Sequence, residues 1–231
     1  MSTGHGPEDY NTDNFDGNFD DGFGTSGTEG LLLPPWERRE RYGFLNGLYL
    51  TIKDVLLTPR TFFHRMPSQM GLAQPLYFAL VIGVVAAFFN WMWSLAGSSL
   101  EMLFTDDLGD VLQGPISNFM FFLFSPVIVA VLVFVKAAIF HVVLMLVKGD
   151  KLGFEATFRV AAYGEAAGIL ALVPGCGHFI GILWSLFVTI VGLYSIHETD
   201  PWKAVVAVVA PMFLCFSTFA ASIVMLMLAI D

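Results

Sequence analysis

Residues 174–211 read PGCGHFIGILWSLFVTIVGLYSIHETDPWKAVVAVVAP. This stretch begins with a glycine-proline turn and contains two apolar runs, one ending at Ile196 and one that begins at Trp202 and continues to Ile230. A hydrocarbon core of about 30 Å needs about 20 helical residues, and each run supplies that length. The segment between the two runs is short and polar. The stretch therefore predicts a helical hairpin that crosses a bilayer twice.

The polar segment of this hairpin carries His197, Glu198, Asp200 and Lys203. We interpret it as a turn that links two helices and not as an acid-base site, because Asp200 followed by Pro201 is a typical N-cap and first-turn signal. The sequence contains no Ser-His-Asp set, HExxH motif, phosphate-binding glycine loop or paired-carboxylate site. We therefore predict no catalytic residues and no cofactor, and we expect that the protein is not an enzyme.

The composition of the 231-residue chain also indicates a membrane protein. Apolar residues make up 56% of it and charged residues 13%, and the mean hydropathy is +0.69. Soluble domains average about 45–50% apolar and about 25% charged residues. The formal net charge of −9 belongs mostly to residues 1–30, which hold seven acids and no Lys or Arg. The rest of the chain is nearly neutral, so no basic surface for nucleic acid is expected.

We predict an all-α membrane protein in three parts. Residues 1–35 form an acidic tail that buries too little apolar surface to fold; we prefer a solubilising tail to the alternative, a short partner-binding motif. Residues 36–74 form a juxtamembrane segment with an amphipathic helix, because apolar residues recur on one helical face from Phe44 to Leu56. This helix is too short to span, and we expect it to lie on the membrane surface. Residues 75–230 form the transmembrane domain.

Five spans are expected in the transmembrane domain, at about residues 75–97, 116–147, 154–174, 178–196 and 202–230. The second apolar run would be about 48 Å long as a helix, and no polar loop divides it. We therefore predict one long helix that is tilted, protruding or broken near Pro126. Lys and Arg outside the helices precede the first span or lie in the loops after the second and fourth spans. This distribution predicts a cytoplasmic N-terminus and a C-terminus outside.

Four ionisable residues fall inside the predicted spans: Lys136, His141, Arg159 and Glu165. Lys136 lies about 18 Å, and Glu165 about 17 Å, from the cytoplasmic ends of their spans. Consecutive spans are antiparallel neighbours, so we predict an ion pair between Lys136 and Glu165, with His141 one turn closer to the cytoplasm. The structural interpretation is a buried pair that sets helix register. The alternative is a polar route through a small transporter or channel, lined by Lys136, His141 and Glu165.

Small residues at four-residue spacing predict close packing between the third and fourth spans. Cys176 and His178 supply only two of the four ligands that a structural zinc ion takes, so no metal site is expected. Cys176 and Cys215 lie at different depths, so no disulfide between them is expected. The glycine pairs of the packing prediction are Gly164 with Gly168 and Gly177 with Gly181.

From Leu45 onward the chain resembles the Yip1-domain family in its bacterial branch. The resemblance rests on the order of three motifs: LLTPRTFFHRMP before the first span, RVAAYGEAAGILALVPGCG in the third, and GHFIGILWSLFVTIVGLYSIHETDPWKAVVAVVAP through the last two. The residues at family-motif positions are Pro59, Phe62, Phe63, Tyr163, Pro174, Gly177, His178, Trp184, Gly192, His197, Ala204 and Pro211.

The resemblance implies five transmembrane helices, a cytoplasmic N-terminus and a non-enzymatic role in organising membranes or binding partners. Eukaryotic members of the family bind Rab GTPases and partner membrane proteins in traffic between the ER and the Golgi. The DLYGP-type motif of that branch is absent here, so Rab binding is not expected. We expect a bacterial inner (cytoplasmic) membrane, with an ER or Golgi membrane as the alternative. Besides the bilayer, the expected partners are membrane or cytoplasmic proteins that contact residues 1–74.

Overall fold

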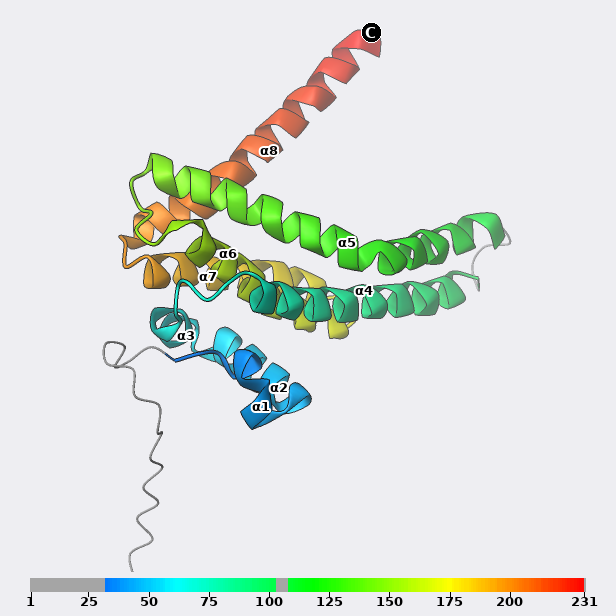
Figure 1. Ribbon diagram of the computed structural model, residues 1–231. Helices are drawn as coiled ribbons and strands as arrows, with labels where there is room; N and C mark the ends of the chain where they lie inside the picture. Colours follow the sequence, from blue (N-terminus) through cyan, green and yellow to red (C-terminus); the bar gives the residue numbers. More distant parts are fainter. Residues whose placement is uncertain (1–31, 103–107, 231) are drawn as a thin grey trace, which may run out of the picture. The chain divides into compact units, whose positions relative to one another are not determined.

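The computed structural model describes residues 32–102 and 108–230, and within these ranges its regular elements are helices (Figure 1). Most of the predicted acidic tail, residues 1–31, lies outside them. The described N-terminal part holds the 3-10 helix η1 (Pro35–Arg38) and the helices α1 (Arg39–Tyr42), α2 (Phe44–Leu57) and α3 (Pro59–Arg65). The remainder holds α4 (Ala73–Glu101), α5 (Leu108–Leu146), α6 (Gly153–Tyr163), the 3-10 helix η2 (Gly164–Leu172), α7 (Gly177–Ile196) and α8 (Pro201–Ile230).

Four helices in the described part of the chain are long and apolar enough to cross a membrane. They cover Ala73–Glu101, Leu112–Leu146, Gly177–Ile196 and Pro201–Ser222. The chain is therefore an all-helical, multi-pass membrane protein. Helix α7 begins and ends within one residue of the range expected from the sequence.

Helix α5 is one long helix of 39 residues, and both Pro115 and Pro126 lie inside it. The prediction of a single helix over the second apolar run is therefore confirmed. A proline removes one backbone hydrogen bond and pushes against the preceding turn, which bends a helix without ending it when neighbours support both halves. Helix α4 gives that support along much of α5, and Figure 1 shows α5 bending beside it.

The sequence had led us to expect a continuous α-helix for the third span, but the structure shows otherwise. It divides at Gly164 into α6 and the nine-residue 3-10 helix η2. A 3-10 helix is narrower than an α-helix, and η2 is rich in Gly and Ala, so it packs closely against both α4 and α7.

Glycines at the contact between η2 and α7 allow the two backbones to approach. A Cβ atom at Gly177 would lie 2.1 Å from the carbonyl oxygen of Leu170, and one at Gly181 would lie 3.1 Å from that of Ala167. The packing predicted from the glycine spacing is thus confirmed at this contact.

Helix α2 packs against the rest of the protein through part of the expected apolar face, together with Gly47 and Thr51, which lie outside that face. Its buried residues are Gly47, Thr51 and Val55, which recur every four residues. The predicted apolar face is split, because Leu45 and Tyr49 are exposed while Leu48, Ile52 and Leu56 pack on the core. Thr51 is buried because its hydroxyl accepts a hydrogen bond of 2.9 Å from the backbone N–H of Trp36. A polar side chain with such a partner can face the core, which a hydropathy pattern does not register.

The core between the N-terminal elements and the long helices is built around large aromatic side chains. Trp36, Phe63, Phe78 and Tyr163 are fully buried and come from η1, α3, α4 and α6. Their rings meet edge-on or tilted, as for Trp36 on Phe78 with centroids 5.9 Å apart. The N-terminal elements are therefore part of one core with the long helices.

Candidate functional site

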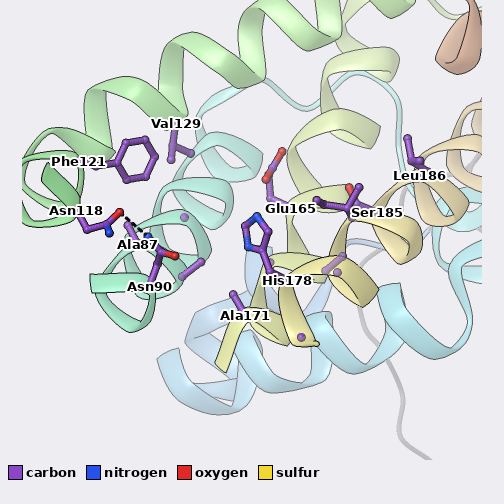
Figure 2. Close-up of a pocket in the computed structure, with 17 residues that line it drawn as sticks. Ala87, Asn90, Asn118, Phe121, Val129, Glu165, Ala171, His178, Ser185 and Leu186 are labelled. Atoms are coloured by element: carbon purple, nitrogen blue, oxygen red, sulfur yellow. Dashed lines mark hydrogen bonds between the residues drawn. The ribbon is translucent and has the colours of Figure 1, made fainter. Parts of the chain in front are cut away.

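A cavity of about 570 Å³ lies between α4, α5, η2 and α7. Its walls are mainly small and apolar, and a few polar side chains converge on it, as in many small-molecule sites. Figure 2 shows Glu165 and His178 near its centre, and Asn90 and Asn118 joined across α4 and α5 by a hydrogen bond of 3.0 Å. The other lining residues are Gly83, Ala86, Ala87, Phe121, Val129, Ala167, Gly168, Ala171, Gly177, Gly181, Ile182, Ser185 and Leu186.

Helix η2 supplies one wall of this cavity. Residues three apart lie above one another in a 3-10 helix, so Glu165, Gly168 and Ala171 form a single row. All three line the cavity. The row presents one carboxylate followed by two small residues, and at Gly168 a Cβ atom would lie 3.3 Å from Cγ2 of Ile82 on α4.

Lys136 on α5 forms an ion pair with Glu165 on η2. The side chains are 26% and 31% exposed in the protein, so each is partly covered. The two residues predicted to lie at similar depth on neighbouring helices therefore meet. Whether the pair serves a function beyond packing stays a prediction.

His141 does not join this pair. Its Nδ1 lies 3.2 Å from Oγ1 of Thr157, and the same Oγ1 lies 3.0 Å from Nε2 of His197. Asp150 completes the group, with its Oδ1 3.3 Å from Nδ1 of His197. The structure thus separates His141 from Lys136 and Glu165, although the sequence had placed the three together. The pairing of Lys136 with Glu165 was expected, but the face on which His141 lies was not considered.

His197 is buried at the end of α7, where the sequence suggested a solvated turn. Its Nδ1 accepts long backbone hydrogen bonds from Lys151 and Leu152, at 3.3 and 3.4 Å. Burial disfavours the charged imidazole and lowers the pKa of His197 to about 4; Asp150 opposes this shift, and His141 and Lys151 add to it. The residue is therefore neutral at physiological pH and ties the loop after α5 to the end of α7.

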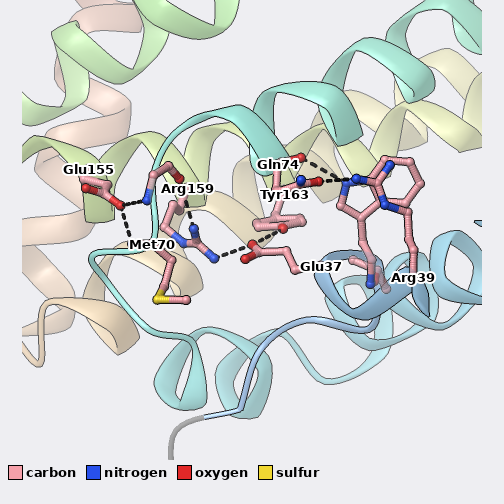
Figure 3. Close-up of polar contacts among 10 residues, drawn as sticks. Glu37, Arg39, Met70, Gln74, Glu155, Arg159 and Tyr163 are labelled. Carbon is pink, nitrogen blue, oxygen red and sulfur yellow. Dashed lines mark hydrogen bonds and ion pairs between the residues drawn. The ribbon is translucent and has the colours of Figure 1, made fainter. Parts of the chain in front are cut away.

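A second polar cluster joins the N-terminal segment to the long helices (Figure 3). Arg159 on α6 is fully buried, forms an ion pair with Glu37 and donates a hydrogen bond of 3.2 Å to the carbonyl of Gly71. The Tyr163 hydroxyl donates to the same carboxylate, at 2.5 Å. Sequence reasoning placed Arg159 inside the third span but assigned it no partner, because Glu37 lies 122 residues away in the chain.

The loop before α4 is held by the same part of the protein. Glu155 accepts hydrogen bonds from the backbone N–H groups of Met70 and Gly71, at 2.6 and 2.5 Å. Trp36 donates its indole N–H to the carbonyl of Gln74 at 3.0 Å, and Arg39 lies over the Trp36 ring. These contacts fix the entry of the chain into α4.

The residues at family-motif positions occupy several places in the fold. Pro59, Phe63, Tyr163, Gly177, Gly192, His197 and Ala204 are buried, and Phe62 is partly buried. Pro174 lies in the turn before α7, and His178 faces the cavity. Trp184 is partly exposed and donates a hydrogen bond of 3.2 Å to the carbonyl of Leu56, and Pro211 lies inside α8. Most of these positions therefore serve packing.

No metal centre is evident in residues 32–102 and 108–230, because these ranges contain no group of three or more His, Cys, Asp or Glu side chains placed to hold an ion. Cys176 and Cys215 are free thiols and both are exposed in the protein.

The long apolar helices and the partly covered charges between them define a multi-pass helical membrane protein. A family model, the Yip1 domain, matches residues 53–222, which is most of the chain, and the protein belongs to this family. No curated protein matches the chain. No solved structure matches it either.

Proposed function

We propose that the chain is a non-enzymatic protein that organises a membrane or binds partners through its N-terminal part. The observation that carries this proposal is the surface of α2. Leu45, Tyr49 and Leu57 are 63–76% exposed, although the same helix is packed firmly on the core by its opposite side. A rigid helix that presents large apolar side chains outward suits contact with acyl chains or with a partner's helix.

We further propose five spans: the four long apolar helices and one more, third in chain order, that α6 and η2 form together. At 1.5 Å per residue for α6 and 2.0 Å for η2, the two would cover about 34 Å, which matches a hydrocarbon core of about 30 Å. The contacts support this assignment, because the loop before α6 contacts His197 at one end of α7, while Leu170 near the end of η2 contacts Gly177 at the other. The positive-inside distribution then supports a cytoplasmic N-terminus and a C-terminus outside.

For the membrane itself, we propose the bacterial inner membrane, with an ER or Golgi membrane as the alternative. The absence of the DLYGP-type motif supports the bacterial assignment and argues against Rab binding. Partners are expected among membrane or cytoplasmic proteins.

Site-specific photocrosslinking in native membranes tests the partner-binding proposal. A photoreactive amino acid at position 45 or 49 is expected to give a discrete protein adduct, whereas the same probe at position 40, an exposed site on α1 away from this row of α2, is not. The experiment is repeated without residues 1–30, and an unchanged adduct would exclude the tail from the contact. Lipid adducts alone at positions 45 and 49 would contradict partner binding through α2.

A small transporter or channel is the second candidate, and the cavity beside Glu165 is the observation that favours it. Because His141 lies away from the cavity, the proposed transport route does not include it. Its charged or titratable groups are Lys136, Glu165 and His178. Purified protein in liposomes that contain a pH-sensitive dye would reveal proton flux under an imposed pH gradient. We expect Glu165→Gln to abolish such flux and Glu155→Gln, outside the cavity, to preserve it. If liposomes with the wild-type protein showed no more proton flux than protein-free liposomes, proton transport would be ruled out.

A further inference from the structure

A second pocket, of about 640 Å³, lies between α3 and the turn that joins α7 to α8. It lies at the end of the protein where His197 meets the loop after α5, and away from the residues that line the cavity around Glu165. Its lining is largely polar: Arg60, Thr61, His64, Arg65, Tyr194, Ser195, Glu198, Thr199 and Pro201.

One face of α3 supplies the positive charge of this pocket. Arg60 and His64 are four residues apart, as are Thr61 and Arg65, so all four side chains lie on neighbouring rows of the helix. Arg60, His64 and Arg65 are exposed and line the pocket. Guanidinium groups donate two parallel hydrogen bonds to phosphate or carboxylate oxygens and are suited to hold such groups.

The opposite wall provides two hydroxyl groups without partners. Ser195 is only 5% exposed, and neither its Oγ nor the Oγ1 of Thr199 forms a hydrogen bond within the protein. A buried polar atom without a partner costs about 1–3 kcal/mol, so such atoms usually indicate a missing ligand or water. Both residues line the pocket that α3 faces.

The N-terminus of α8 adds a further favourable dipole. Pro201, its first residue, lines the pocket, and α8 continues for 30 residues. The first backbone N–H groups of a helix have no intrahelical acceptors, and they favour anions. One carboxylate opposes this, since Glu198 also lines the pocket, 4.0 Å from Nδ1 of His64. The lining still holds two arginines against that one carboxylate.

We propose that this pocket binds a phosphate group, with Arg60 and Arg65 pairing with its oxygens and Ser195 and Thr199 donating hydrogen bonds to them. The group is either a small soluble phosphate or the headgroup of phosphatidic acid. In both cases it is a terminal phosphate with up to two negative charges, which match the two arginines better than the single charge of a phosphodiester would.

Calorimetric titration of the full chain in a non-ionic detergent tests the proposal with four probes. They are inorganic phosphate, glycerol 3-phosphate, and mixed micelles of phosphatidic acid or of phosphatidylcholine. Binding of the first two assigns a soluble ligand, and binding of phosphatidic acid alone assigns a lipid headgroup. No binding of inorganic phosphate, glycerol 3-phosphate or phosphatidic acid, or equal binding of phosphatidylcholine, would overturn the proposal.

Charge variants show whether the binding occurs in this pocket. Arg60→Gln combined with Arg65→Gln is expected to weaken binding by about 10- to 100-fold, since charge-assisted hydrogen bonds are lost. The control, Arg41→Gln combined with Lys53→Gln, removes the same charge outside the pocket and is expected to leave affinity unchanged. Glu198→Gln is expected to tighten binding. Equal losses in the pocket and control variants would mean non-specific attraction and would overturn the proposal.

Ser195→Ala separates a binding role from a structural one. Removal of a hydroxyl without a partner should leave the thermal midpoint of the ligand-free protein unchanged or slightly higher. The rise in that midpoint on adding the phosphate probe should be smaller than in the unmodified protein. A ligand-induced rise as large as in the unmodified protein would exclude Ser195 from the site, and a large loss of midpoint without ligand would assign it to packing.

Discussion

Arg159 holds its guanidinium group at a position with no solvent exposure, paired with Glu37 of the N-terminal segment. The Tyr163 hydroxyl and the Gly71 carbonyl complete the cluster, and only Nε of the guanidinium is left without a partner. Such a pair is weak evidence for net stability, but it is costly to break on one side. It therefore acts mainly to specify how the N-terminal segment docks.

Removing one partner of this pair should destabilise the protein strongly. We expect Glu37→Ala or Arg159→Met to lower the free energy of unfolding by about 3–5 kcal/mol, because each leaves an unpaired buried charge or acceptor. The double variant should lose less than the sum of the two, as measured by thermal or urea unfolding in micelles. The neighbouring exposed Glu40→Ala is the control and should change stability little. Additive losses would show that the two residues do not interact.

His197 should make stability depend on pH. Its pKa is lowered to about 4 in the folded protein, against 6.5 as the ordinary value, so the unfolded chain binds more protons between these values. The contribution of His197 to stability is therefore fully present above pH 6.5 and is lost as the pH drops towards 4. The free energy of unfolding then falls by up to about 3 kcal/mol. Unfolding midpoints of the wild type and His197→Gln should differ in slope over this range, while His64→Gln, an exposed residue, should keep the wild-type slope. Equal slopes in wild type and His197→Gln would contradict this assignment.

Among the elements, α7 contacts the N-terminal helices α2 and α3 as well as α6 and η2. Its glycines make this possible, since Gly181 faces the backbone of η2 and Gly192 faces α6 and α3. A Cβ atom at Gly192 would lie 2.6 Å from Cγ1 of Val160 and 3.0 Å from the Phe63 ring. Helix packing at this distance has no room for a methyl group.

Gly192→Ala should therefore destabilise the protein even though alanine favours helices. We expect a loss of about 1–3 kcal/mol from overpacking, measured as a lower unfolding midpoint in micelles. Gly97→Ala in α4 is the matched control, because a Cβ atom there meets nothing within 4 Å. That variant should be neutral or more stable, by about 1 kcal/mol at most. A neutral Gly192→Ala would mean that α7 can shift away from α6 without loss.

At the scale of the whole molecule, the decisive question is whether α6 and η2 cross the membrane together. If they do, the turn at Pro174–Cys176 and the loop before α6 lie on opposite sides of the bilayer. If they return without crossing, both lie on the same side.

Cysteine labelling on intact cells distinguishes these arrangements. In the Cys215→Ser variant, a membrane-impermeant maleimide should label Cys176 without permeabilisation. In a chain without other cysteines, Leu152→Cys should be labelled only after permeabilisation, because that loop is expected in the cytoplasm. Labelling of both positions from the same side would exclude a crossing by α6 and η2.

The sequence by itself determined the helical membrane character, the approximate limits of the long helices and the pairing of Lys136 with Glu165. These follow from the length and period of apolar runs and from the fixed rise of a helix, which are local properties. The change from α-helix to 3-10 helix at Gly164, the cavity that η2 lines and the buried face of α2 depend on which neighbours each residue meets.

Tertiary structure alone decided the pairing of Glu37 with Arg159, the separation of His141 from Lys136 and the burial of His197. Each depends on the rotation of one helix about its axis relative to another, which periodicity in a nearly uniform apolar run does not define. The pocket between α3 and the turn that joins α7 to α8 also depended on tertiary structure, because its arginines and its unpaired hydroxyls lie more than 100 residues apart in the chain.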